Sequence, residues 1–149
     1  MNETYEFLMG CMQENWLHAR LCEEKRATTA NLVIVLATAV QAMLLLTGIN
    51  RKALALTMLL MVLGLYGLLA SAKLYERSQF HIRRARRLRA RLDELLPDAR
   101  VQPLQSTAEE EHTAHYPVLS HVRLNTIWLG VHLLVVILGV VDTIICFGG

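Results

Sequence analysis

The sequence lacks charged side chains over three long stretches. No Asp, Glu, Lys or Arg lies between residues 27 and 50, between 53 and 72, or between 124 and 141. At about 1.5 Å of rise per residue, helices of these lengths extend about 27 to 36 Å, which matches a bilayer core of about 30 Å. What remains is about half the chain, too little for a separate enzyme domain with its own large core. We therefore predict an all-α membrane protein with three transmembrane helices.

Catalytic and metal-binding patterns are also missing. The sequence has no P-loop, no G-x-S-x-G and no evident Ser/His/Asp set. The three cysteines have no metal-binding spacing, and His112-x-x-His115, in an expected loop, lacks a third ligand at a defined spacing. Five glutamates precede the first apolar stretch, so no signal peptide is expected. We predict a protein that is not an enzyme and that uses no metal or cofactor.

The positive charges are unevenly distributed. Of the 15 Lys and Arg residues, 10 lie between residues 73 and 123, 3 precede the first charge-free stretch and 2 lie in the short loop that follows it. Positive residues near membrane helices are retained in the cytoplasm. This pattern predicts a cytoplasmic N-terminus, an external C-terminus and a tight external turn at residues 48–52, where Gly48 and Asn50 are typical turn residues.

The apolar stretches and their flanks predict the organisation of the chain. We expect a cytoplasmic amphipathic arm at 1–26, transmembrane helices at 27–48, 53–73 and 123–146, a cytoplasmic Arg-rich helix at 74–97, and a connector at 98–122. No Gly or Pro interrupts residues 11–47 or 68–96, so the first two membrane helices should continue into the cytoplasm. There they should pack as an antiparallel helical bundle. Its two apolar faces would be Tyr5, Leu8, Met12, Trp16 and Ala19, and His81, Ala85, Leu88, Leu92 and Leu95.

Residues 83–91 contain six arginines. Arg83, Arg87 and Arg91 share one helix face, with Arg84 beside them. One interpretation is retention on the cytoplasmic side together with attraction to anionic lipids. The other is a polyanion site for a nucleotide or oligonucleotide, since guanidinium groups bind phosphates bidentately.

Polar residues recur along one side of two predicted membrane helices. In the third helix the stripe consists of Asn125, Trp128, His132, Gly139, Asp142 and Cys146, and in the first it consists of Asn31, Thr38, Gln41 and Gly48. Ionisable residues in a membrane mark ion pathways by default. The stripes are therefore candidates for a pore lining or an oligomer interface, and the alternative is a packing seam between helices. Gly64, Gly67 and Ser71 give the second helix a small-residue face, which favours close helix packing.

The order of these features resembles a known family. An arm with Trp16, Ala19 and Arg20 and two paired membrane helices are followed by Lys73-Leu74-Tyr75-Glu76-Arg77, His81, the Arg-rich helix and Leu92-Asp93-Glu94-Leu95-Leu96-Pro97. Over residues 1–97 the chain resembles the SLATT superfamily of small bacterial membrane effectors. With its third helix it looks more like the membrane subunit of Hailong-type antiphage systems.

The resemblance implies a pore-forming homo-oligomer, with four copies as the expected number, in the bacterial inner membrane. It also implies control by a DNA oligomer made by a partner nucleotidyltransferase. Our prediction is an ion channel effector of abortive infection that is gated by a nucleotide or oligonucleotide and depolarises the membrane. The alternative is a non-conducting membrane anchor or adaptor that recruits a soluble partner.

Overall fold

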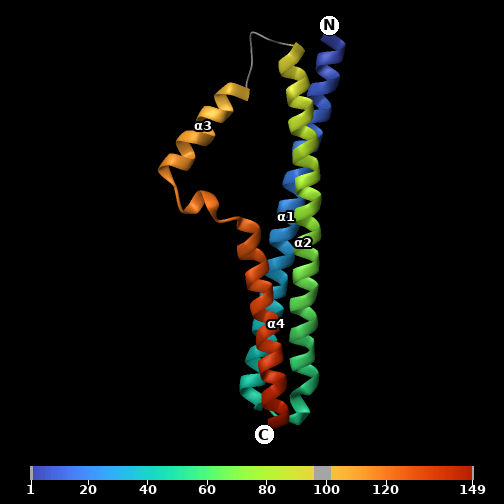
Figure 1. Cartoon of the computed structure of the whole chain (residues 1–149). Coiled ribbons are helices and arrows are strands. Elements are labelled where there is room, and N and C mark those ends of the chain that lie inside the picture. The colour runs from blue at the N-terminus through green and yellow to red at the C-terminus, as the bar shows by residue number, and fades with distance from the viewer. Residues whose placement is uncertain (1, 96–101, 149) are drawn as a thin grey trace. The chain divides into compact units, whose positions relative to one another are not determined.

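The computed structural model describes residues 2–95 and 102–148, in which all regular secondary structure is helical (Figure 1). The elements are α1 (Asn2–Thr47), the 3-10 helix η1 (Arg51–Ala53), α2 (Leu54–Leu95), α3 (Gln102–His115), the 3-10 helix η3 (Leu119–His121) and α4 (Leu124–Gly148). Three helices, α1, α2 and α4, are long and apolar enough to cross a membrane. This finding confirms the all-α prediction with three candidate spans and indicates a multi-pass membrane protein.

The chain divides into two compact units. The membrane unit comprises Glu24–Tyr75 and Leu124–Gly149, and the arm unit comprises Met1–Glu23 and Glu76–Arg123. Both α1 and α2 contribute to each unit as unbroken helices, as the absence of Gly and Pro from residues 11–47 and 68–96 predicts. The 46 residues of α1 extend over about 69 Å, more than twice the thickness of a bilayer core. Only part of α1 can therefore lie in a membrane.

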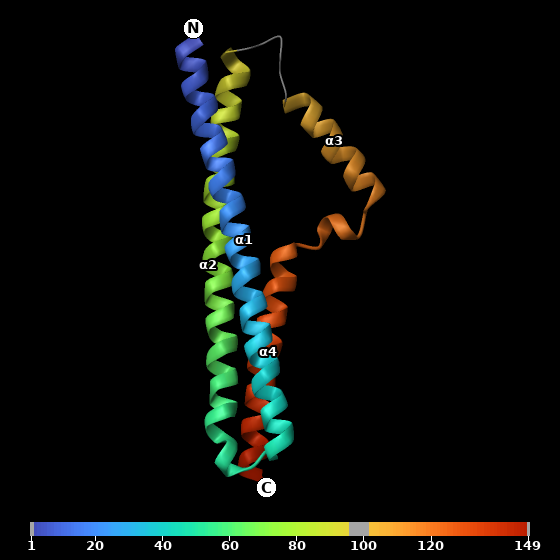
Figure 2. The same ribbon diagram turned by 180° about the vertical axis from the view of Figure 1, so that it is seen from behind.

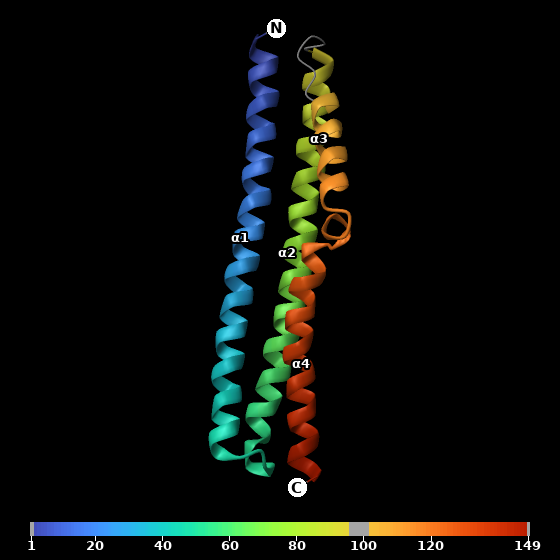
Figure 3. The ribbon, with the colours of Figure 1, turned by 90° about the vertical axis from the view of Figure 1, so that its left-hand side faces the viewer.

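The three helices of the membrane unit run side by side (Figures 2 and 3). Each presents one inner stripe whose positions alternate by three and four residues, the spacing of coiled-coil packing. The stripes consist of Arg26, Ala30, Val33, Ala37, Val40 and Leu44 in α1, of Ala53 at the end of η1 with Thr57, Leu60, Gly64, Gly67 and Ser71 in α2, and of His132, Val135, Gly139, Asp142 and Cys146 in α4.

Glycines bring α2 and α4 into close contact. A Cβ atom on Gly64 would lie 2.6 Å from the Val136 side chain, and one on Gly139 would lie 2.7 Å from the Met61 side chain. Close approach through small residues replaces the hydrophobic driving force that is absent between helices in lipid. The predicted small-residue face of α2 is therefore the surface on which α4 packs.

The turn between α1 and α2 is built as the sequence predicts. Gly48 has a φ of +80°, a conformation that side chains with a Cβ rarely adopt. Asn50 caps η1, because its side-chain oxygen accepts a hydrogen bond from the Lys52 backbone N–H at 3.0 Å. These two residues reverse the chain within a few positions.

In the arm unit, the N-terminal part of α1 and the C-terminal part of α2 contact each other. All ten residues of the two predicted apolar faces are buried or half-buried, with Ala19, Ala85 and Leu92 among the most buried. The Ser78 hydroxyl donates to the Ala19 carbonyl at 3.5 Å, which links the two helices directly. Seven-residue spacing of Ser78, Ala85 and Leu92 marks the inner face of α2.

The connector contains a helix that the sequence analysis missed. Residues 102–115 form α3, so His112 and His115 lie on a helix and the expected loop is wrong here. Pro103 does not prevent this, because a proline in the first helical turn lacks only an N–H that would have no partner inside the helix.

Candidate functional site

A cavity of about 810 Å³ lies among α1, α2 and α3 of the arm unit. Its volume falls within the range of small-molecule sites. The lining residues are Gln13, Trp16, Leu17, Arg20, Arg86, Arg89, Ala90, Gln105, Ser106 and Glu109. Three arginines and one indole ring thus meet in a single cavity, and we call it the arginine pocket.

Contacts within the arginine pocket join its three helices. The Arg89 guanidinium carbon lies 5.8 Å from the centroid of the Trp16 ring, and Arg89 Nη1 donates to Gln105 Oε1 at 2.5 Å. At this distance the positive charge of Arg89 interacts favourably with the face of the Trp16 ring. The pocket therefore combines positive charge, which suits phosphate oxygens, with an aromatic face, which suits a planar ring.

The four arginines predicted as the polyanion site lie outside this pocket. All four are exposed: Arg83, Arg84, Arg87 and Arg91. Arg84 lies over the Phe80 ring at 5.5 Å, and Arg91 forms an ion pair with Glu94. The structure instead brings together Arg86 and Arg89 from the same run with Arg20 from α1, which the sequence analysis did not select.

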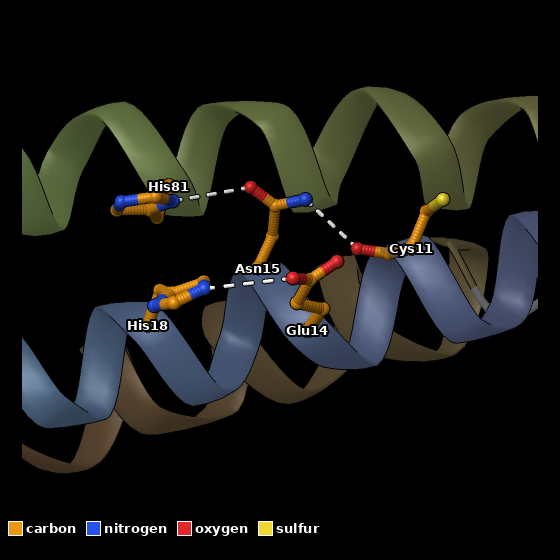
Figure 4. A network of polar contacts seen from close by, with 5 residues as sticks. All are labelled: Cys11, Glu14, Asn15, His18 and His81. Carbon is orange, nitrogen blue, oxygen red and sulfur yellow. Dashed lines mark hydrogen bonds and ion pairs between the residues drawn. The ribbon is translucent and has the colours of Figure 1, made fainter.

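A second polar cluster of the arm unit contains two stacked histidines (Figure 4). The rings of His18 and His81 lie 5.1 Å apart, centroid to centroid, at an interplanar angle of 28°. Asn15 Nδ2 donates to the Cys11 carbonyl at 2.8 Å, so Asn15 Oδ1 faces His81 Nδ1 at 3.2 Å. Because this amide oxygen can only accept, we assign the His81 proton to Nδ1.

The environment of His81 favours its neutral form. Burial lowers the pKa of His81 below its ordinary value of 6.5, and the neighbouring positive charges of His18, Arg77 and Arg84 lower the pKa further. The Glu14 Oε1 atom lies 3.7 Å from His18 Nε2. The cluster therefore joins α1 and α2 through an uncharged His81.

At one end of the membrane unit, Arg26 is buried among three side chains. Only 2% of Arg26 is exposed, and its guanidinium carbon lies 5.6 Å from the centroid of the Tyr75 ring and 5.9 Å from that of the Trp128 ring. Arg26 Nη1 also donates to Asn125 Oδ1 at 3.3 Å. The predicted residues Asn125 and Trp128 thus both contact Arg26. The sequence analysis had counted Arg26 only among the positive charges before the first apolar stretch.

Deeper in the membrane unit, the α4 stripe faces the interior of the single chain. His132 is completely buried, and a Cβ atom on Gly67 would lie 2.3 Å from its Nδ1 atom. Asp142 is 4% exposed, and Gly139 is buried against α2. In this arrangement these three predicted residues occupy a packing seam between helices of the single chain.

The predicted polar residues of α1 lie outside the inner stripe of α1, whereas the α4 stripe is the inner face of α4. Asn31 and Thr38 are exposed, whereas Gln41 is half-buried. The Thr38 hydroxyl donates to the Ile34 carbonyl at 2.8 Å, which satisfies it within its own helix. The structure therefore does not bring the two predicted stripes together.

The fold and these sites define a class, a multi-pass helical membrane protein with an arginine-lined pocket in its arm unit. Comparison with protein-family models, curated proteins and solved structures gives no match for the chain. Function must therefore be argued from the chemistry of the described residues.

Proposed function

We propose that the chain is the protomer of a homo-oligomeric ion channel in the bacterial inner membrane. The observation that carries the proposal is the burial of two ionisable residues, His132 and Asp142, inside one candidate membrane span. Such residues are costly in lipid and commonly mark the route of an ion. The arginines between residues 73 and 123 support a cytoplasmic arm unit and contacts with anionic lipids.

Oligomerisation supplies the lumen. Three helices packed around a filled core cannot enclose a channel, so several protomers must surround one, and cyclic symmetry closes the ring. Asn31 and Thr38, exposed on α1, are the residues we assign to the contact between protomers. An exposed amide in a membrane helix gains a hydrogen bond when a second copy covers it. Four copies remain the expected number.

We assign control of the channel to the arginine pocket. Arg20, Arg86 and Arg89 would hold phosphate groups, and Trp16 offers a face for a base. A nucleotide or a short oligonucleotide made by a partner nucleotidyltransferase fits this chemistry. On the resemblance described above, we propose an antiphage effector that depolarises the cell during abortive infection.

Ion flux from vesicles tests the proposal. The purified 16.8 kDa chain is reconstituted into liposomes loaded with K⁺, and efflux and membrane potential are followed. We expect efflux above that of empty vesicles, single-channel steps in planar bilayers, and a particle mass that is a multiple of the protomer mass. A ring of Asp142 carboxylates would favour cations, so Asp142→Asn should lower the cation preference. An oligomer or monomer without flux would support the membrane adaptor instead.

A further inference from the structure

Unpaired polar atoms gather in the membrane unit. Among the residues that the structure describes, every buried side-chain nitrogen or oxygen atom without a hydrogen-bond partner belongs to this unit. They include Ser71 Oγ, both ring nitrogens of His132, Asp142 Oδ2 and Gln41 Oε1. A buried polar group without a partner costs several kcal/mol in an apolar medium, and lipid supplies no water to replace the partner. The packed membrane unit therefore carries a penalty that hydration would remove.

Most of these atoms lie where α4 meets α2. His132 and Asp142 belong to the inner stripe of α4, and Ser71 belongs to that of α2. By contrast, the hydroxyls of Thr57 in α2 and Thr143 in α4 lie 2.9 Å apart, and the Thr143 hydroxyl lies 2.7 Å from the Gly139 carbonyl. The α2–α4 contact thus contains one satisfied polar pair beside unsatisfied ionisable residues.

An apolar layer separates the polar positions along this contact. Val135 lies between His132 and Asp142 on the α4 stripe, and it belongs to a buried apolar cluster with Leu60 and Val40. A packed apolar layer of this kind keeps water away from its surroundings, and His132 and Asp142 are buried beside it. In the described arrangement neither of these ionisable side chains can therefore line a water-filled lumen.

We propose, on the basis of the channel function proposed above, that this packing is the closed state and that the channel opens when α4 moves away from α2. Separation exposes His132, Ser71 and Asp142 to the water of the lumen. It also opens the glycine contacts at Gly64 and Gly67, whose loss opposes the gain in hydration. Two opposing terms at one contact make α4 a two-state element, which a ligand that favours one arrangement can shift.

A reversible lock tests the movement. The test chain carries Cys11→Ser, Cys22→Ser and Cys146→Ala, which remove the native thiols, together with Thr57→Cys and Thr143→Cys. The hydroxyls of Thr57 and Thr143 are near enough for two sulfur atoms at these positions to form a disulfide. Oxidation should reduce K⁺ efflux to that of empty vesicles, and reduction should restore it. Each single cysteine variant should conduct equally with and without oxidant.

The outcomes separate two failures. If the bridge forms and the oxidised and reduced proteins conduct equally, α4 does not move away from α2 and the inference is overturned, while the channel stands. If the reduced protein conducts neither alone nor with a short oligothymidylate added, the channel function itself fails, and the inference fails with it.

A second variant drives α4 in the opposite direction. A Cβ atom on Gly67 would lie 2.3 Å from His132 Nδ1, so Gly67→Ala should push α4 outward, whereas Gly130→Ala adds a Cβ atom with nothing within 4 Å. Cys146 is 1% exposed on the α4 stripe and reports the movement. In a chain with Cys11→Ser and Cys22→Ser, Gly67→Ala should raise both efflux and the rate of maleimide labelling at Cys146, and Gly130→Ala should change neither. Raised efflux with Cys146 still protected would overturn the inference, and a variant that does not fold leaves the lock to decide.

Discussion

The arm unit and the membrane unit use the same helical spacing but treat polar groups differently. In the arm unit, the buried Asn15 donates to the Cys11 carbonyl and faces His81 at hydrogen-bond distance. In the membrane unit, His132 is completely buried and neither of its ring nitrogens has a partner among the described residues. A soluble surface can hydrate such groups, whereas lipid cannot. Unsatisfied polar atoms are therefore a stronger functional signal in the membrane unit than they would be in the arm unit.

The largest effect is expected where glycine holds α4 on α2. Gly139→Leu places a branched side chain where a Cβ atom alone would lie 2.7 Å from the Met61 side chain. Overpacking should lower the free energy of unfolding by about 3 kcal/mol. Gly130→Leu, with nothing within 4 Å of the added Cβ, is the matched control on the same helix. Unfolding of both variants in detergent micelles measures the difference, and equal stabilities would contradict the close α2–α4 contact.

A smaller loss is expected at the Arg26 site. Arg26→Met keeps an apolar stem but removes the charge that faces Tyr75 and Trp128 and the hydrogen bond to Asn125. The expected cost is about 2 kcal/mol in the same unfolding assay, because a desolvated cation–π contact and a charged hydrogen bond are both lost. Lys25→Met removes an exposed positive charge one residue away and should change stability little. Equal effects would mean that only net charge matters here.

These two sites also show what the sequence could predict. The stripe from Asn125 to Cys146 follows from helical spacing alone, and its burial was one of the two outcomes considered. The role of Arg26 was missed, because it depends on Tyr75 and Trp128, which are far away in the chain. The α3 helix was missed because its sequence is polar and carries a proline in the first turn.

The arginine pocket required the same non-local information. Helical spacing groups Arg83, Arg87 and Arg91, and it also predicts the apolar face of α2 that contains Ala85 and Leu92, but it does not say which arginines lie beside Arg20 of α1. The structure answers that question, since Ala85 and Leu92 are buried and Arg86 and Arg89 line the pocket beside them. A seven-residue spacing of small or apolar residues within the Arg-rich run was the available signal.

The arginine pocket predicts a difference between arginines of one helix. Arg86→Gln with Arg89→Gln should weaken binding of a short oligothymidylate by about tenfold or more, because a hydrogen bond to a charged group contributes about 1.5 to 3 kcal/mol. Arg83→Gln with Arg84→Gln removes the same charge from the exposed face and should have a smaller effect. Quenching of tryptophan fluorescence measures both affinities at one fixed salt concentration. A greater loss of affinity in the Arg83 and Arg84 variant would show that the polyanion binds to the exposed arginines and not in the arginine pocket.

The smallest effect is expected from protonation of His81. The pKa of His81 is lowered when α1 and α2 are packed together. Below pH 6.5, His81 therefore binds a proton when the two helices are apart but not when they are packed. Packing of α1 on α2 should therefore be fully stable above pH 6.5 and weaken as the pH falls from 6.5 toward the lowered pKa. Hydrogen exchange of the amides of residues 11–19 at pH 7.5 and 5.5, corrected for intrinsic rates, measures this loss. His81→Gln keeps a donor for Asn15 Oδ1 but cannot titrate, so the pH effect should disappear, whereas His115→Gln on the exposed surface of α3 should preserve it. An unchanged pH effect in His81→Gln would contradict the assignment to His81.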